Sequence, residues 1–343
     1  MTGSTATRHA LVQGRISGHL KLRGRGLTAL PPEACEIGTV ALPEGSAWWE
    51  TRETLEALDA SQNEMTALPD AIAALDQLRE LDVSRNRLTA LPEAECWAQL
   101  EALVSLVVGH NQLGALPAGL GAHNLPPLVR LAANDNQLTT LPPTLGGLRD
   151  LVELDLSRNR LGRLPRGLSG LASLKKLDMS ANCLVELPDD LLASPPPLTD
   201  LDLSENQLHA LSLCLPAALK LNLAKNRLTA LGLEGCGSVQ EVVAPYNALS
   251  TLPTGLPALP ALATIDLGAN KLVRIDELVR SSAARARLCT RRTTHRATCV
   301  ACSSLGSDAP ALDSRASRPR VPRSPAWTSP IMTCARCRRG WAF

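Results

Sequence analysis

One asparagine returns through most of this chain at a nearly constant interval, and this interval constrains the fold more than any other feature. The asparagines share the frame L-x-x-L-x-L-x-x-N-x-L-x-x-L-P, and successive ones are 20 to 25 residues apart. They are Asn63, Asn86, Asn111, Asn136, Asn159, Asn182, Asn206, Asn226, Asn247 and Asn270. A degenerate copy at residues 20–31 precedes them, with Arg25 in the asparagine place. The pattern predicts a solenoid of about eleven repeats.

Each repeat contains one short segment, L-x-L, in which apolar and polar residues alternate. This alternation is typical of a strand with one buried face. A repeat of about 23 residues with a single strand must return on the other side of the coil, so successive strands lie parallel. A single repeat cannot cover its own leucines, and stacking on its neighbours buries them. Aromatic residues make up only 2% of the chain, which fits a core built almost entirely from leucine.

The asparagine ends the strand, and its side chain can pair with backbone groups of the turn. A buried polar group that loses its partner costs about 1–3 kcal/mol. We therefore interpret the ten asparagines as a structural ladder rather than as ligand contacts.

The repeat resembles the intracellular leucine-rich repeat class that includes Ras-interacting and Ras-suppressor proteins. The N-terminal order is more specific: SGHLKLRGRGLTALPPEA, a spacer ending in Trp48-Trp49-Glu50, and a first full repeat at Leu55–Pro69. This order resembles the family of leucine-rich repeat-containing protein 40. The resemblance covers about residues 17–278 and implies a horseshoe-shaped α/β solenoid with a parallel sheet on its concave side. It also implies protein binding, and it carries over no catalytic residue.

The composition divides the chain into three parts. Residues 1–16 are expected to be a flexible N-terminus, residues 17–280 the repeat domain with a spacer at 32–54, and residues 281–343 a basic tail. The tail holds twelve arginines, no lysine and two acidic residues, a charge of +10, so the net charge of +2 leaves −8 for residues 1–280. Its Ser, Pro and Arg content predicts disorder.

Polar positions between the strand leucines should line the concave face. Four residues before the asparagine, six of the ten repeats carry aspartate. These are Asp59, Asp82, Asp155, Asp178, Asp202 and Asp266. The aspartates can serve solubility as a repeat consensus, or they can form an acidic cradle for a basic partner segment.

Two interruptions of this acidic pattern are candidate partner contacts. At the first, Val107 and Ala132 replace aspartate, and Ser105, His110, Arg130 and Asp135 should surround them as a polar rim. The second is Val243 with Tyr246, the single tyrosine of the chain. Tyrosine and arginine are enriched at energetic hot spots, so we expect Arg130 and Tyr246 to anchor a partner, with Asp155, Asp178 and Asp202 between them. Ordinary drift among repeats is the alternative.

The tail contains two CxxC pairs, Cys299 with Cys302 and Cys334 with Cys337. Four thiolates can hold zinc, but 31 residues separate the pairs, more than the usual spacing of about 15–20. They remain a weak metal candidate. A nucleic-acid-binding or membrane-binding tail is a second possibility, and a shifted frame of a GC-rich gene would yield the same composition.

The function expected from these patterns is a non-catalytic scaffold or adaptor that binds a protein partner, with no cofactor and no small-molecule substrate. No phosphate-binding loop, HExxH or GxSxG motif is present. The alternatives are a nucleic-acid- or membrane-associated protein that uses the arginine-rich tail, or a substrate-selecting subunit of a ubiquitin-ligase-type enzyme. The N-terminus leads into no apolar signal segment, and no apolar run reaches the roughly 18 residues of a membrane span. The expected location is therefore the cytoplasm or nucleus, not the cell exterior.

Overall fold

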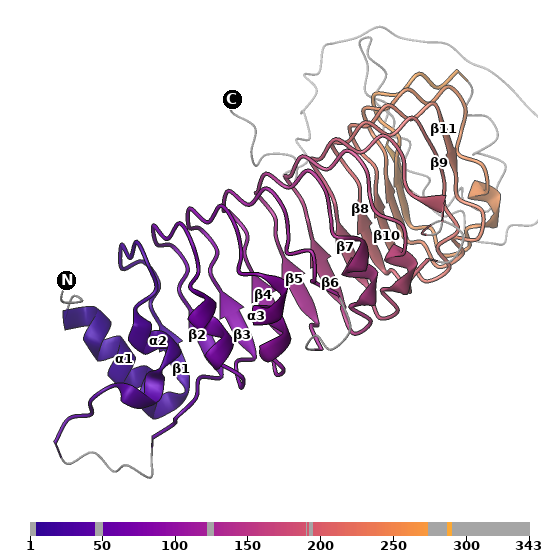
Figure 1. Ribbon diagram of the computed structural model, residues 1–343. Helices are drawn as coiled ribbons and strands as arrows, with labels where there is room; N and C mark the ends of the chain where they lie inside the picture. The colour runs from indigo at the N-terminus through magenta and orange to yellow at the C-terminus, as the bar shows by residue number, and fades with distance from the viewer. Residues whose placement is uncertain are drawn as a thin grey trace, which may run out of the picture. The chain divides into compact units, whose positions relative to one another are not determined.

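The repeats form a parallel sheet in which each coil of the chain contributes one strand (Figure 1). The structure, a computed structural model, describes residues 5–44, 51–121, 127–189, 191, 195–273 and 287–289. The sheet has twelve strands and confirms the predicted α/β solenoid. Its strands are, in order, β1 (His19–Lys21), β2 (Ala57–Asp59), β3 (Glu80–Asp82), β4 (Ser105–Val107), β5 (Arg130–Ala132), β6 (Glu153–Asp155), β7 (Lys176–Asp178), β8 (Asp200–Asp202), β10 (Lys220–Asn222), β12 (Glu241–Val243), β13 (Thr264–Asp266) and β14 (Arg287–Cys289).

Equivalent residues of neighbouring repeats stand opposite one another in this sheet. Between β6 and β7, for example, Leu154 pairs with Leu177 and Asp155 with Asp178. The middle residue of the strands β1 to β13 is buried, because it points into the space that the coil encloses. The first and third residues point to the other side, which we call the open face of the sheet.

The asparagines link each coil to the one before it. Asn136 is buried; its Oδ1 accepts the backbone N–H of Leu113 at 3.0 Å, and its Nδ2 donates to the carbonyl of Val108 at 3.1 Å. Both partners belong to the preceding repeat, and the bonds recur from Asn63 to Asn270. The ten asparagines therefore satisfy backbone groups inside the solenoid that water does not reach.

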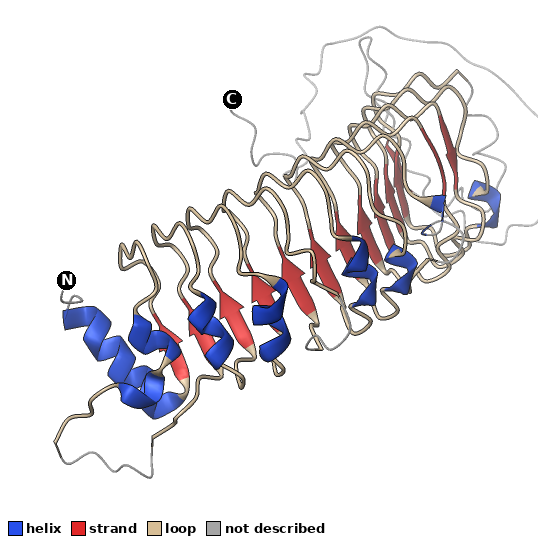
Figure 2. Cartoon of the chain, in the orientation of Figure 1, coloured by secondary structure: helices blue, strands red, loops and turns tan. Residues whose placement is uncertain are grey.

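The return segments are short helices in most coils and strands in two of them (Figure 2). The helices are α2 (Pro32–Cys35), α3 (Ala94–Gln99) and the 3-10 helices η1 (Ile37–Thr39), η3 (Asp70–Ala74), η4 (Pro143–Gly147), η5 (Leu168–Gly170) and η6 (Leu256–Ala258). Where the spacing falls to 20 and 21 residues, between Asn206 and Asn226 and between Asn226 and Asn247, the return is extended. There β9 (Ala210–Ser212) pairs with β11 (Ala230–Gly232) as a second, two-stranded sheet.

Both ends of the repeat domain differ from expectation. The sequence predicts a flexible segment at residues 1–16, but α1 (Thr5–Ser17) is a helix that buries Ala10 and Leu11 against the first repeat. This helix covers apolar surface that β1 would otherwise expose. The sequence also predicts that the repeat domain ends at residue 280, yet β14 pairs with β13 in register, with Leu288 opposite Ile265. Trp48 and Trp49 lie outside the described residues.

Candidate functional site

The open face carries two hollows. The larger, of about 470 Å³, is lined by side chains from β5, β6, β7, β8, β10 and β12. The smaller, of about 330 Å³, is lined by residues of β1 to β5. Every lining residue belongs to a strand, so none of the described return segments contributes to either hollow. Arg130 lines both hollows and stands at the boundary between them.

Most of the predicted partner contacts lie on this face. Ser105 and Val107 line the smaller hollow. The larger hollow is lined by Arg130, Ala132, Asp155, Asp178, Asp202 and Val243. Sequence spacing therefore identifies residues that share one surface, although up to five strands separate them.

The remaining three predicted contacts lie in the turns that follow the strands. His110, Asp135 and Tyr246 each precede a ladder asparagine and have a left-handed backbone, with φ of 56°, 51° and 57°. All ten residues in this position have φ between 51° and 58°. Tyr246 is 61% exposed and lines neither hollow. Arg130 and Tyr246, which the sequence predicts to act together, therefore belong to different surfaces of the coil.

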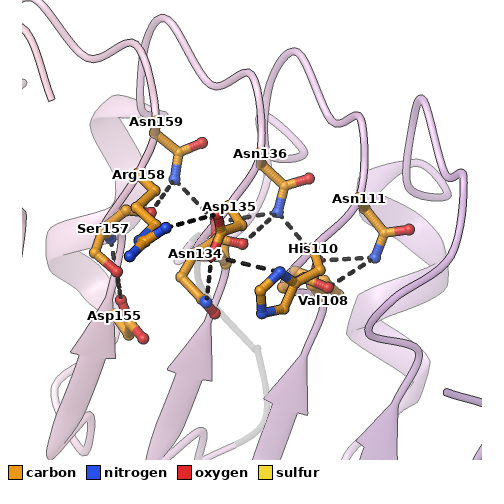
Figure 3. A network of polar contacts seen from close by, with 12 residues as sticks. Val108, His110, Asn111, Asn134, Asp135, Asn136, Asp155, Ser157, Arg158 and Asn159 are labelled. Atoms are coloured by element: carbon orange, nitrogen blue, oxygen red, sulfur yellow. Dashed lines mark hydrogen bonds and ion pairs between the residues drawn. The ribbon is translucent and has the colours of Figure 1, made fainter. Parts of the chain in front are cut away.

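Asp135 is the centre of a polar network at the ends of β4, β5 and β6 (Figure 3). His110 Nδ1 lies 3.4 Å from its Oδ2, and Arg158 Nη1 lies 3.9 Å from its Oδ1. Asn134 Nδ2 also donates to Oδ2 at 3.3 Å. Of the four residues predicted as a polar rim, His110 and Asp135 therefore contact each other, whereas Ser105 and Arg130 lie on β4 and β5 outside this network.

The aspartates of the acidic pattern also hold the turns. Oδ1 of Asp155 accepts the backbone N–H of Ser157 at 3.0 Å and its hydroxyl at 2.7 Å. The same bond to the residue two places on is made by Asp59, Asp82, Asp178, Asp202 and Asp266. Solubility alone, the first interpretation from the sequence, therefore does not account for their repetition.

Five charged residues of the larger hollow are not among the predicted contacts. They occupy the first position of their strands, six residues before the asparagine. They are Glu153, Lys176, Asp200, Lys220 and Glu241. The repeat frame locates this position, but the aspartate pattern, four residues before the asparagine, does not include it. Glu153 accepts a hydrogen bond from Lys176 at 2.7 Å, which lowers the pKa of the Glu153 carboxyl.

Asp178 lies between two other carboxylates in the hollow. Burial raises the pKa of its carboxyl, the hydrogen bonds from Ser180 lower it, and the charges of Asp202 and Asp155 raise it again. The net shift is upward. Burial and, to a smaller extent, its two acidic neighbours therefore disfavour the charged form of Asp178.

The described residues contain no group of three or more histidine, cysteine or acidic side chains that could hold a metal ion. Cys299, Cys302, Cys334 and Cys337 lie outside the described residues. None of the described helices is long and apolar enough to cross a membrane. What the site offers is a hollowed surface with charged and apolar groups at fixed spacing.

The sequence matches the family described as "Leucine rich repeat" over residues 101–161, 126–184 and 149–208. The chain carries a leucine-rich repeat solenoid. No curated protein sequence matches it. A leucine-rich repeat protein of Leptospira interrogans is similar in structure, with 25% identity and a TM-score of 0.61, over 84% of this chain and 80% of that one.

Two further solved structures resemble this leucine-rich repeat solenoid. YopM, a leucine-rich effector protein from Yersinia pestis, is 25% identical with a TM-score of 0.54, over 80% of each chain. The plant peptide hormone receptor RGFR1 in complex with RGF2 is 26% identical with a TM-score of 0.53, over 71% of this chain and 42% of that receptor chain.

Proposed function

We propose that the chain is a non-catalytic scaffold that binds a protein partner on the open face of its sheet, between β5 and β12. The observation that carries the proposal is the hollow of about 470 Å³, lined from six strands. Proteins of the leucine-rich repeat fold generally serve as protein-interaction scaffolds, but a fold alone does not assign a function. The proposal therefore rests on the surface itself.

The chemistry of this hollow suits a polypeptide. Ala132 and Val243 stand at its two ends, and charged side chains of both signs lie between them. Charged side chains of both signs beside apolar ones can offer a polypeptide both ion pairs and apolar contacts. The structural likeness to a peptide hormone receptor in complex with its peptide supports the same kind of use.

The setting that we propose is intracellular signalling, in the cytoplasm or nucleus. It rests on the resemblance of the repeat to the intracellular class with Ras-interacting members and, at the N-terminus, to the family of leucine-rich repeat-containing protein 40. A small GTPase or one of its regulators is the partner to look for first.

The test is affinity capture with the full chain as bait, beside a variant that fills the hollow, Ala132→Arg/Val243→Arg. A matched control, Arg163→Ala/Arg166→Ala, changes two residues between the Asn159 turn and η5. The proposal expects a partner that the native bait and the control retain and the filled variant loses. Equal capture by all three baits would place the binding surface elsewhere.

A further inference from the structure

The charges of the larger hollow are arranged in rows that run across the strands. The first row, from the first residue of each strand, alternates in sign and sums to zero. It consists of Arg130, Glu153, Lys176, Asp200, Lys220 and Glu241. Glu153 lies 2.7 Å from Lys176 and 3.7 Å from Arg130. The first row therefore compensates its own charge.

The third residues of the same strands make a row of different character. It consists of Ala132, Asp155, Asp178, Asp202, Asn222 and Val243. Asp155 stands opposite Asp178, and Asp178 opposite Asp202, on three adjacent parallel strands. We call these three residues the acidic row. Among the described residues, no ion pair joins any of the three to a basic side chain.

Two basic residues in the turns beside the hollow are paired with acidic residues of those turns and not with the acidic row. Arg158 lies 3.9 Å from Asp135, and Lys225 lies 2.6 Å from Glu205. In the acidic row, Oδ1 of each aspartate is used by its turn, while no described hydrogen bond reaches Oδ2 of Asp155 or Asp178. The acidic row therefore brings three negative charges and two carboxylate oxygens to the hollow, and none of the described ion pairs includes them.

We propose that this hollow binds an extended segment of a protein partner whose central residues are arginine or lysine and whose ends are apolar. Strands at about 4.8 Å place Asp155 and Asp202 roughly 10 Å apart, and Ala132 and Val243 roughly 24 Å apart. An extended chain advances about 3.3 Å per residue, so the occupant is roughly seven residues long, with its cations within a central stretch of about three residues. The acidic row repels nucleic acid and anionic lipid, which leaves a basic polypeptide as the occupant.

This proposal rests on the proposed function and specifies its partner. The variant that tests it is Asp155→Asn/Asp178→Asn/Asp202→Asn in the full chain. Asn222 shows that asparagine can hold the same turn, because its Oδ1 accepts the N–H of Ala224 at 3.2 Å. The substitutions therefore remove charge and keep the turn bonds.

A matched control changes three aspartates that occupy the same position of other strands, outside the larger hollow: Asp59→Asn/Asp82→Asn/Asp266→Asn. These residues make the same turn bonds, to Ser61, Ser84 and Gly268. The control removes the same charge without touching the acidic row. Urea unfolding of both variants checks that they fold.

The probe is the fluorescein-labelled peptide Leu-Gly-Arg-Arg-Arg-Gly-Leu, compared by fluorescence anisotropy with a peptide that has three glutamines in place of the arginines. We expect the native chain and the control to bind the arginine peptide within about twofold of one another. We expect the acidic-row variant to bind the arginine peptide at least roughly tenfold more weakly than the native chain does. The native chain should bind the glutamine peptide with a similar loss of affinity.

Equal binding of the two peptides, or equal loss in both variants, would overturn this inference. Failure of the inference and of the proposed function can be told apart. If the hollow-filling variant loses a partner that the acidic-row variant retains, the open face binds protein but does not select a basic segment. If both variants retain every captured protein, the proposed function fails as well.

Discussion

Asn222 donates a hydrogen bond from its Nδ2 to Oδ2 of Asp202, on the neighbouring strand, at 2.7 Å. Asn222 occupies the place that aspartate holds in most repeats, and it ends the acidic row at three charges. The neutral side chain of Asn222 therefore donates to Asp202 at the position where an aspartate would add a fourth negative charge to the row.

Asn222→Asp should therefore destabilise the protein. The substitution removes a donor and places like charges opposite one another on adjacent strands, which costs up to about 1 kcal/mol. Urea unfolding at neutral pH measures the loss. The swapped variant Asp202→Asn/Asn222→Asp restores a donor beside a carboxylate and should recover most of it. Equal stability of Asn222→Asp and the native chain would contradict the argument.

Asp178→Asn should raise stability at neutral pH and have no such effect in acid. The pKa of Asp178 is raised in the folded state, so folding binds protons in the window above its ordinary value of 3.8. The contribution of Asp178 to the free energy of unfolding is therefore largest below that value, and it is lost as pH rises through the raised pKa. The asparagine variant does not titrate, so its stability does not fall for this reason. Urea unfolding of both proteins across acidic pH should show their difference shrink as pH falls toward 3.8; a constant difference would argue against a titrating Asp178.

Asn136→Ala should be among the costly single substitutions in the repeats. It leaves the N–H of Leu113 and the carbonyl of Val108 without their partner inside the solenoid, at roughly 1–3 kcal/mol. Asn270→Ala should cost less, because Asn270 itself is only partly buried, so water can take the place of the side chain that the substitution removes. Chemical unfolding compares the two, with the exposed neighbour Gln137→Ala as control. A larger effect at Asn270 would contradict this ranking.

Gly14→Leu should loosen the N-terminal cap. A Cβ at Gly14 would lie 3.1 Å from Cδ1 of Leu20 and 3.2 Å from its Cβ, so a larger side chain must push α1 away from β1. Overpacking of this kind costs about 1–3 kcal/mol. Hydrogen exchange should accelerate in β1 and remain unchanged in β6. Gln13→Leu changes the exposed residue before Gly14 and should leave hydrogen exchange in β1 unaltered. If the amides of β1 exchanged equally fast in both variants, the helix would not be docked on β1.

Five of the ten cysteines have a burial that the structure describes, and these five should react in two groups. Burial raises the pKa of Cys35 to about 11 and also raises that of Cys96 and Cys236, so few of these thiols are ionised. Cys183 and Cys214 are exposed and should be alkylated first by iodoacetamide at mildly alkaline pH. Mass spectrometry of the digested protein assigns each site. In urea all five should react alike; early labelling of Cys236 in the native protein would contradict its burial.

The strands, the core and the asparagine ladder follow from the repeat pattern alone. A repeat that buries the same leucine in every coil encodes its own register, since a shift by one residue would expose that leucine. The repeat frame therefore suffices to place Val107, Ala132, Asp155 and Val243 on one face of the sheet.

The pairing of polar side chains on that face depends instead on how the coils stack. Glu153 and Lys176 form an ion pair across 23 residues of sequence, whereas Asp178 meets only acidic neighbours in its own row, because the stacking of coils sets these distances. The same holds at the ends and in the short repeats. The helix of residues 5–17 forms where the first coil needs cover for its apolar edge. The chain returns as β9 and β11 where a shortened repeat leaves too few residues for a helical turn.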